Sequence, residues 1–301
     1  MNRVVVIGSQ YATKKNSVDI LADSLSSDGI EVQKIYWEDL HFDIKTNTVS
    51  VTQDGAQIFE EKPKLVVALG WYKSGDKSIY RDVAFSLALY LEHKKVKFWN
   101  TEMLHQRSTG KLSCMMQLAL SGVNVPRTIF SLKSQNLVDD FTFPSVVKAS
   151  NASRGDSNFL VKTQDDLDQA FAHTNPTNTM IVQPFMPNDH DLRVICFNGE
   201  PQLILKRSRG VGSSSHMNNT SQGGTAEWLT LDSVPAELLT ISKEICKIMN
   251  REMAGIDFIP DTHSDYNYSC LEVNAVPQLT SGHDVTKKMQ ALANTIKGQE
   301  K

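Results

Sequence analysis

The chain has 301 residues, with 31 Lys and Arg against 34 Asp and Glu, so its formal net charge is −3 at pH 7. Hydrophobic residues make up 40% and charged residues 22%, which is ordinary for a soluble globular protein with a sizeable core. This balance provides no basic field for a nucleic-acid backbone, and no apolar stretch has the length of a membrane span. We therefore expect a cytoplasmic protein whose partners include neither nucleic acid nor membrane.

The four cysteines lie far apart and include no CxxC pair: Cys114, Cys196, Cys246 and Cys270. No histidine stands near them at the spacing of zinc ligands. The pattern supports neither a zinc site nor a disulfide framework, and we expect the four side chains to be buried as small hydrophobic groups.

The first third of the chain alternates short apolar runs with helical periodicity. We expect buried parallel strands at 4–8, 32–36 and 65–70, and helices at 18–27 and 81–93. This order predicts a small α/β domain with an open sheet, which we assign to residues 1–103.

The next segment, 104–185, begins with a helix at 111–120 that the Ser121-Gly122 pair ends. Strands are then expected at 143–150 and 180–185, with a Gly-containing turn, a short strand and a helix at 165–173 between them. The segment 186–301 has the pattern of antiparallel structure. Its elements are a hairpin over 191–209 around Asn198-Gly199, a helix at 236–249, and strands at 254–261 and 268–275.

Oxygen ligands are concentrated in two of the last strands, in the sequences AGID and LEVN. Side chains alternate across a strand, so Glu272 and Asn274 share a face, and Asp257 joins them if the two strands pair. Two carboxylates and an amide carbonyl suit Mg²⁺ or Mn²⁺ rather than zinc. The alternative is a solvated edge strand with incidental acidic residues.

Cationic side chains form a second set of candidates. Lys148 ends an apolar strand just before the loop that contains Gly155, where a lysine is placed to contact phosphate oxygens. Arg193 and Arg207 lie in the expected hairpin, where guanidinium groups suit phosphoryl oxygens or a substrate carboxylate. Asn219, in a polar loop, is a weaker candidate. The alternatives are a strand-end lysine at the surface and an exposed basic face.

Taken in order, these segments resemble the ATP-grasp superfamily, specifically its ribosomal-protein glutamate ligase (RimK-like) branch, from about Lys111 to Pro277. The matching residues are Lys111 ahead of GVNVPRT, Lys148 in FPSVVK, the QPF segment from Gln183, DLR from Asp191 to Arg193, Lys206-Arg207, Asn219 ahead of a glycine pair, Asp257 in AGID, and Glu272 with Asn274 in LEVN.

The resemblance implies an α/β N-terminal domain followed by an ATP-grasp fold, in which two α+β lobes enclose the nucleotide and the Gly155 loop is the lid. It assigns residues to ATP as follows: Lys111 and Lys148 to the phosphates, the backbone of Val182, Gln183, Pro184 and Phe185 to adenine, Asp189 to the ribose, and Lys206 and Asn219 to the same nucleotide site. By the same resemblance, Asp257, Glu272 and Asn274 hold two Mg²⁺ or Mn²⁺ ions. Arg193 and Arg207 hold the acyl-phosphate and the carboxylate.

The function implied is an ATP-dependent carboxylate–amine ligase that forms an amide through an acyl-phosphate and releases ADP and phosphate. Two alternatives keep the fold: a kinase-like phosphotransferase, and an inactive module that binds nucleotide or peptide. The substrates are a small-molecule or peptide carboxylate and an amine that no motif identifies, and a homo-oligomer is left open. The chain departs from the family in its lid, which has one glycine, and in Gln278, which follows Pro277 where the family has Pro-Gly.

Overall fold

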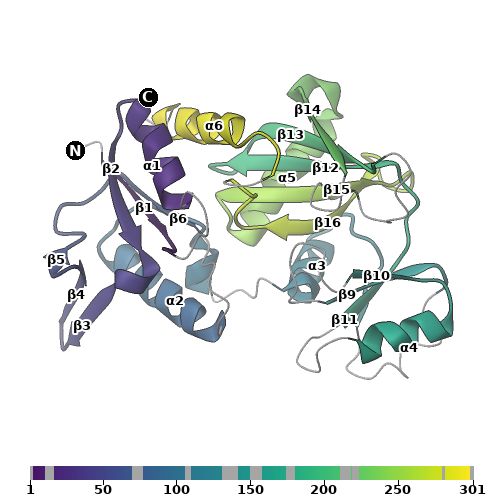
Figure 1. Ribbon diagram of the computed structural model, residues 1–301, viewed down its shortest axis with the longest axis horizontal. Helices are drawn as coiled ribbons and strands as arrows, with labels where there is room; N and C mark the ends of the chain where they lie inside the picture. The colour runs from purple at the N-terminus through teal and green to yellow at the C-terminus, as the bar shows by residue number, and fades with distance from the viewer. Residues whose placement is uncertain are drawn as a thin grey trace.

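A computed structural model gives the fold of the chain (Figure 1). It describes residues 3–10, 17–69, 77–105, 110–130, 142–149, 158–173, 180–210, 218, 224–279 and 282–298. Gly155 and Asn219, two of the expected site residues, lie outside these ranges. Among the described helices, none has both the length and the apolar character needed to cross a membrane.

The N-terminal part is a parallel sheet between two helices, as expected. The strand order is β2 (Glu31–Tyr36), β1 (Arg3–Gly8), β6 (Leu65–Ala68) and β7 (Phe98–Trp99). Alternate residues of β1 point to opposite faces: Val4 and Val6 pack with α1 (Ser17–Ser27), whereas Val5 and Ile7 pack with α2 (Lys77–His93). Both faces are covered, which is why the strands are uniformly apolar.

A second, three-stranded antiparallel sheet extends from this domain, and the sequence patterns did not predict it. It comprises β3 (His41–Lys45), β4 (Thr48–Gln53) and β5 (Ala56–Gln57), after the short 3₁₀ helix η1 (Trp37–Asp39). Its turns use Asn47 at φ 62° and the Asp54-Gly55 pair at φ 51° and 77°. These residue types tolerate the left-handed region.

The central part is a smaller sheet covered by one helix. The strand order is β10 (Asn158–Val161), β9 (Ser145–Ala149), β11 (Met180–Pro184) and β8 (Ile129–Phe130), and the helix is α4 (Gln164–Ala172). Thr163 and Asp166 form a capping box at the start of α4, which satisfies backbone N–H groups of its first turn. In Figure 1 this part lies apart from the parallel sheet, at the other end of η2 (Thr101–His105) and α3 (Lys111–Leu120).

The C-terminal part is a five-stranded antiparallel sheet. The order is β14 (Thr225–Leu229), β13 (Glu200–Ser208), β12 (His190–Phe197), β15 (Met253–Pro260) and β16 (Tyr268–Asn274). The hairpin between β12 and β13 turns at Asn198 and Gly199, whose φ angles of 55° and 75° match the predicted two-residue turn. The short helix η5 (Leu231–Ser233) precedes α5 (Ala236–Met249), which has the bounds expected from the sequence.

The two faces of this sheet pack against different partners. On one face, Leu192, Val194 and Phe258 pack with α5 and α3, together with all four cysteines, which are buried free thiols as predicted. On the other face, Ile195 and Phe197 pack with β1, α1 and the C-terminal helix α6 (Val285–Gly298). Figure 1 shows α6 returning to lie beside α1. One apolar core thus joins the beginning and the end of the chain.

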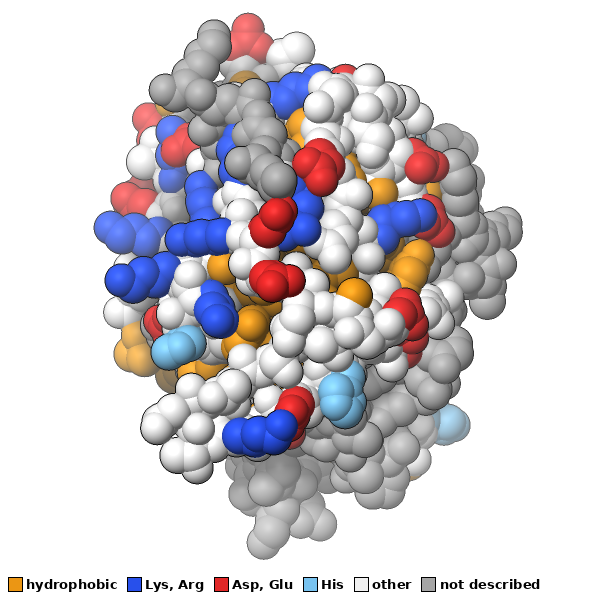
Figure 2. Space-filling model, turned by 90° about the vertical axis from the view of Figure 1, so that its left-hand side faces the viewer, with side chains coloured by type: hydrophobic (Ala, Val, Ile, Leu, Met, Phe, Trp, Pro, Cys, Tyr) orange, Lys and Arg blue, Asp and Glu red, His pale blue; other side chains and the backbone are white. Residues whose placement is uncertain are grey.

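Charged side chains of both signs are interspersed on the end of the molecule that Figure 2 shows. Ion pairs of the N-terminal domain and α6 include Lys34 with Asp19 at 2.8 Å and Lys297 with Asp28 at 2.9 Å. Mixed charges of this kind create no field of a single sign on this face, in agreement with the near-neutral composition.

The junction between the first domain and the last sheet depends on a buried ion pair. Arg251 Nε donates to the carboxylate of Glu102, and the two side chains are 2% and 7% exposed. Beside them, the backbone N–H of Thr101 donates to Glu252 at 3.0 Å, and Asn100 donates to the carbonyl of Ala275 at 2.9 Å. The segment that leaves the parallel sheet is therefore fixed to β15 and β16 by polar contacts removed from water.

We expect Arg251→Met to lower the free energy of unfolding by about 3–5 kcal/mol, because it leaves the Glu102 carboxylate buried without its counter-charge. The double variant Arg251→Met with Glu102→Gln removes both charges and should be more stable than the single variant. Urea unfolding of the three proteins measures this. A double variant less stable than Arg251→Met would contradict the assignment.

Candidate functional site

Charged residues replace apolar ones halfway along one face of the C-terminal sheet. On β12 the residues of this face are Asp191, Arg193, Ile195 and Phe197, because side chains alternate along the strand. Ile195 and Phe197 lie in the core shared with α6, whereas Asp191 and Arg193 lie beyond it. The polar half of this face is the candidate site.

A buried network of four charges occupies this half. Arg193 contacts Asp257 through two hydrogen bonds, Nε to Oδ1 at 2.6 Å and Nη2 to Oδ2 at 2.7 Å. Arg207 Nη2 lies 3.1 Å from Asp257 Oδ2, and its Nε donates to Asp191 Oδ1 at 2.5 Å. Burial by itself raises the pKa of Asp257, but the charges of Arg193 and Arg207 outweigh it and lower this pKa to about 2. The Asp257 carboxylate therefore stays ionised at neutral pH.

Gly255 provides the space that Pro277 needs beside the charged network. A Cβ atom at this position would lie 2.7 Å from Pro277 Cβ and 3.7 Å from Arg193 Cδ, so a larger residue would displace its neighbours. This close approach explains the glycine two residues before Asp257.

The expected oxygen ligands lie next to this network. Asp257 pairs with Glu272 and Gly255 with Asn274 across β15 and β16, so the condition under which Asp257 joins the other two residues is met. The side chain of Glu272 is 37% exposed and lies 3.7 Å from Lys111 Nζ. The side-chain Nδ2 of Asn274 is buried and has no hydrogen-bond partner in the described part of the chain. Two carboxylates and the Oδ1 of an amide are oxygen ligands of the kind a hard cation takes, whereas the unpartnered Nδ2 of Asn274 is a donor that does not bind a cation.

Lys148 reaches this region from β9 of the central sheet. Its Nζ donates to Gln183 Oε1 at 2.8 Å, and Gln183 Nε2 donates to Thr128 Oγ1 at 2.9 Å, which fixes the lysine in place. Burial lowers the pKa of Lys148, the carboxylate of Glu272 opposes this, and the charge of Lys111 adds to it, so that the resulting pKa is about 8. Lysines of two different elements thus face the carboxylate of Glu272.

The structure places the expected adenine and ribose residues at the end of β11 and just beyond it. The N–H of Phe185 donates to the carbonyl of Pro144 at 3.0 Å, and Pro184 has no N–H, so neither backbone group is a ready donor. The next N–H, that of Met186, has no partner among the described residues. Asp189 is exposed and lies 2.6 Å from His190 Nδ1.

Lys206 is not brought into the network. Adjacent residues of a strand face opposite sides, so Lys206 lies on the other side of β13 from Arg207. There its Nζ is 3.1 Å from Glu227 Oε1.

Three residues at this site were not singled out as functional from the sequence. Asp191 could have been recognised, because alternation places it on the same face as Arg193. Gln278 accepts a hydrogen bond from Arg193 Nη1 at 3.1 Å, and Lys288 of α6 donates from Nζ to the carbonyl of Gln278 at 2.6 Å. Lys288 is only 3% exposed. Lys288 could have been recognised as unusual because it is a lysine on the apolar face of the last helix.

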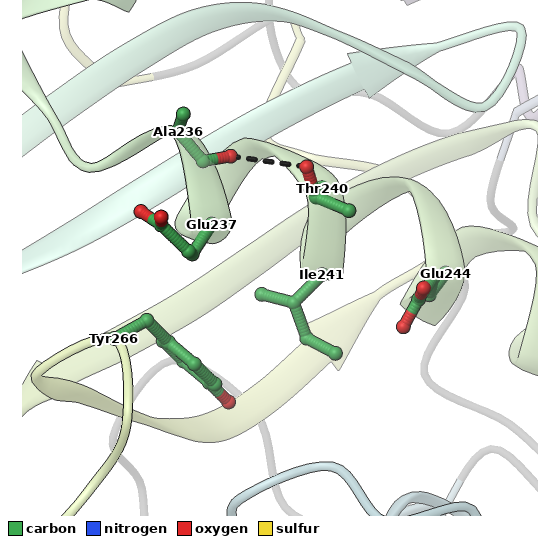
Figure 3. Close-up of a pocket in the computed structure, with 6 residues that line it drawn as sticks. All are labelled: Ala236, Glu237, Thr240, Ile241, Glu244 and Tyr266. Carbon is green, nitrogen blue, oxygen red and sulfur yellow. Dashed lines mark hydrogen bonds between the residues drawn. The ribbon is translucent and has the colours of Figure 1, made fainter.

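A pocket of about 290 Å³ lies on the opposite side of the C-terminal sheet, against α5 (Figure 3). Its lining is Ala236, Glu237, Thr240, Ile241, Glu244 and Tyr266. The hydroxyl of Thr240 is already bonded to the carbonyl of Ala236 in its own helix, at 3.1 Å. The pocket shares no residue with the charged network and is not part of the candidate site.

Comparison with known proteins shows which family the chain resembles. The model of the RimK-like ATP-grasp domain matches residues 108–296, more than half of the chain. A probable alpha-L-glutamate ligase of Aeromonas salmonicida is 29% identical over 204 residues, and one of Trichodesmium erythraeum is 27% identical over 202 residues. Each match covers 63% of this chain and 65% of the relative, so just under two thirds of the relatives' length is matched.

Solved structures resemble nearly the whole chain. The ATP-grasp ligase PsnB, complexed with a precursor variant, Mg and ADP, has a TM-score of 0.73 at 15% identity and covers 99% of this chain and 98% of its own. The macrocyclase MdnC from Microcystis aeruginosa, bound with its precursor peptide, has a TM-score of 0.66 at 15% identity, with 98% and 99% covered. D-alanine–D-alanine ligase from Bacillus anthracis has a TM-score of 0.60 at 15% identity, with 98% and 94% covered. The chain therefore has the ATP-grasp fold.

We expect Asp257→Asn to lower the free energy of unfolding by about 3–5 kcal/mol, because Arg193 and Arg207 then remain buried without their shared counter-charge. Asp43→Asn is the matched control, since Asp43 forms an exposed pair with Lys45 and should cost less than about 1 kcal/mol. Urea unfolding distinguishes the two. Equal losses in both variants would show that the buried network does not have the stabilising role assigned to it.

Proposed function

The chain belongs to the RimK-like ATP-grasp family, and on this basis we propose that it is an ATP-dependent carboxylate–amine ligase. The observation that carries the proposal is that Lys148 of the central sheet lies near enough to Glu272 and Asp257 of the C-terminal sheet for both carboxylates to raise its pKa. Cations and oxygen ligands on facing lobes are what a nucleotide triphosphate requires. We also propose 1–103, 104–185 and 186–301 as the domain boundaries.

In this proposal the nucleotide lies between β9 and β11 on one side and β15 and β16 on the other. Lys148 and Lys111 contact phosphate oxygens. The adenine edge is read by backbone groups after β11, where the N–H of Met186 is a better candidate donor than that of Phe185. Asp189 is placed for the ribose. Gly155 and Asn219 stay in the proposal on the family resemblance alone.

Asp257, Glu272 and Asn274 are proposed to hold Mg²⁺, or Mn²⁺, as one or two ions. The donor set supports this, since two carboxylates and an amide Oδ1 on paired strands are hard oxygen ligands. When bound, the metal would offset the negative charge of the phosphates. Arg193 and Arg207 keep the carboxylate of Asp257 ionised and oriented, whether or not a metal is bound.

The proposed reaction has two steps. An oxygen of the carboxylate substrate attacks the γ-phosphorus, the bond to ADP breaks, and an acyl-phosphate forms. The nitrogen of the amine then attacks the carbonyl carbon, phosphate leaves, and the amine loses a proton. Arg193 and Arg207 are near enough to each other to stabilise negative charge on the substrate carboxylate and the transferred phosphoryl group.

The substrates that the comparisons suggest are amino acids and peptides. Relatives are named alpha-L-glutamate ligases, and similar folds were solved with precursor peptides. We therefore propose that L-glutamate and peptides be tested first, each both as the carboxylate substrate and as the amine substrate. ADP release measured over pairs of them tests the function: ADP that needs both substrates supports ligation, whereas ADP that needs no amine would indicate the kinase-like alternative.

Glu272→Gln should lower turnover by about a hundred-fold or more, because it removes a charged ligand from the proposed metal site. Its melting temperature should change little, since Glu272 is partly exposed. Glu200→Gln removes a similarly exposed carboxylate, paired with Lys243 at 2.7 Å, and should keep full turnover. Full activity of Glu272→Gln would contradict the metal assignment.

The affinity for ADP without metal should fall as the pH rises past about 8, the pKa to which burial lowers Lys148. The folded protein releases this proton before the unfolded chain, whose lysine titrates near 10.5. The stability that Lys148 contributes therefore rises with pH between these values, while its attraction for phosphate is lost. Lys148→Arg stays charged and should bind ADP with less pH dependence. Identical pH profiles of the two proteins would contradict the role of Lys148.

A further inference from the structure

Gln278 has a backbone conformation that its residue type disfavours. Its φ angle is 50°, in the left-handed region where a Cβ atom is sterically unfavourable. Nine described residues other than glycine have such an angle, and all of them are Asn or Asp except Gln278 and Lys95. Asn and Asp tolerate this region, so a glutamine there requires another explanation.

The contacts of Gln278 connect three parts of the structure. Its Oε1 accepts a hydrogen bond from Arg193 Nη1 at 3.1 Å, and its carbonyl accepts one from Lys288 Nζ at 2.6 Å. Its N–H donates to the carbonyl of Val276 at 2.8 Å. A Cβ atom at Gly282 would lie 3.4 Å from Oε1, so the next loop also packs against the amide. A glycine at 278 would relieve the backbone but lose the contact with Arg193.

Two N–H groups of the Arg193 guanidinium have no hydrogen-bond partner among the described residues, and the residue is 7% exposed. A guanidinium has five N–H groups, and three of those on Arg193 are used, two by Asp257 and one by Gln278. One N–H therefore remains on each of Nη1 and Nη2, a pair that suits the two oxygens of a carboxylate. The side chain of Gln278 is exposed, and its Nε2 has no partner among the described residues.

We propose that Gln278 is a specificity-determining residue for the carboxylate substrate, one that fixes the Arg193 guanidinium through Oε1 and donates from Nε2 to a second acceptor oxygen of the same molecule. The inference rests on the proposed ligase function. The ligand it fits is a carboxylate with a further acceptor oxygen nearby, as in an amino dicarboxylate such as L-glutamate. A glycine at this position, which the family pattern has, supplies neither contact.

The test is binding of L-glutamate, by calorimetry, to the full chain saturated with Mg²⁺ and a non-hydrolysable ATP analogue. Gln278→Met keeps the size of the side chain and its backbone strain but removes both amide contacts. Gln278→Glu keeps an acceptor for Arg193 but replaces the Nε2 donor by a negative charge. Both variants should bind L-glutamate at least about ten-fold more weakly, as expected for loss of a hydrogen bond to a charged group. Their affinity for the ATP analogue should be unchanged.

Lys95→Gly is the matched control, because Lys95 has a φ angle of 55° at the exposed end of α2, outside the candidate site. It should raise the melting temperature and leave L-glutamate binding unchanged. Unchanged binding in both Gln278 variants, or no binding of L-glutamate to the wild-type chain, would overturn the inference. If the wild-type chain forms ADP in a carboxylate- and amine-dependent way while the Gln278 variants match it in KM and kcat, the inference fails and the ligase function stands.

Discussion

Burying the Asp257 carboxylate is unfavourable unless hydrogen-bond donors and positive charges replace the water around it. The arrangement of the whole site depends on the residues that supply these donors and charges. Arg193 and Arg207 both donate to Asp257, and Asp191 neutralises part of the charge of Arg207. The guanidinium groups are thereby fixed on one sheet face. Their orientation is set before any substrate binds, which is the condition for electrostatic stabilisation of a reacting group.

The same sheet face also explains how the N-terminal sheet is held against the C-terminal sheet. Its apolar half, with Ile195 and Phe197, packs with β1, α1 and α6, and its charged half begins where this core ends. α6 supplies Lys288 to the charged half while its apolar residues lie in the core. The last helix therefore links the N-terminal domain to the candidate site, so changes in its packing are expected to affect the position of Gln278.

The structural features that depend on residues close together in the sequence were predicted well. The bounds of α5 and the Asn198-Gly199 hairpin agree with the structure, because helical periodicity and turn chemistry are local properties. Strand alternation placed Glu272 and Asn274 on one face, but whether Asp257 joins them depended on a strand pairing that the sequence left open. The extra sheet β3–β5 and the helix α6 were not predicted. Nor was the role of Gln278, since its contacts with Arg193 and Lys288 join segments distant in the sequence. Lys206 lies on the face of β13 opposite Arg207, as alternation places it, and its assignment to the nucleotide site stays a prediction of the family resemblance.

The central claim is that a carboxylate oxygen attacks the γ-phosphorus of ATP to form an acyl-phosphate. The most direct test supplies the carboxylate substrate labelled with oxygen-18, together with ATP, Mg²⁺ and the amine, and analyses the released phosphate by mass spectrometry. The account predicts ADP and phosphate, with labelled oxygen transferred from the carboxylate to the phosphate. Formation of AMP and pyrophosphate, or phosphate without the label, would contradict it.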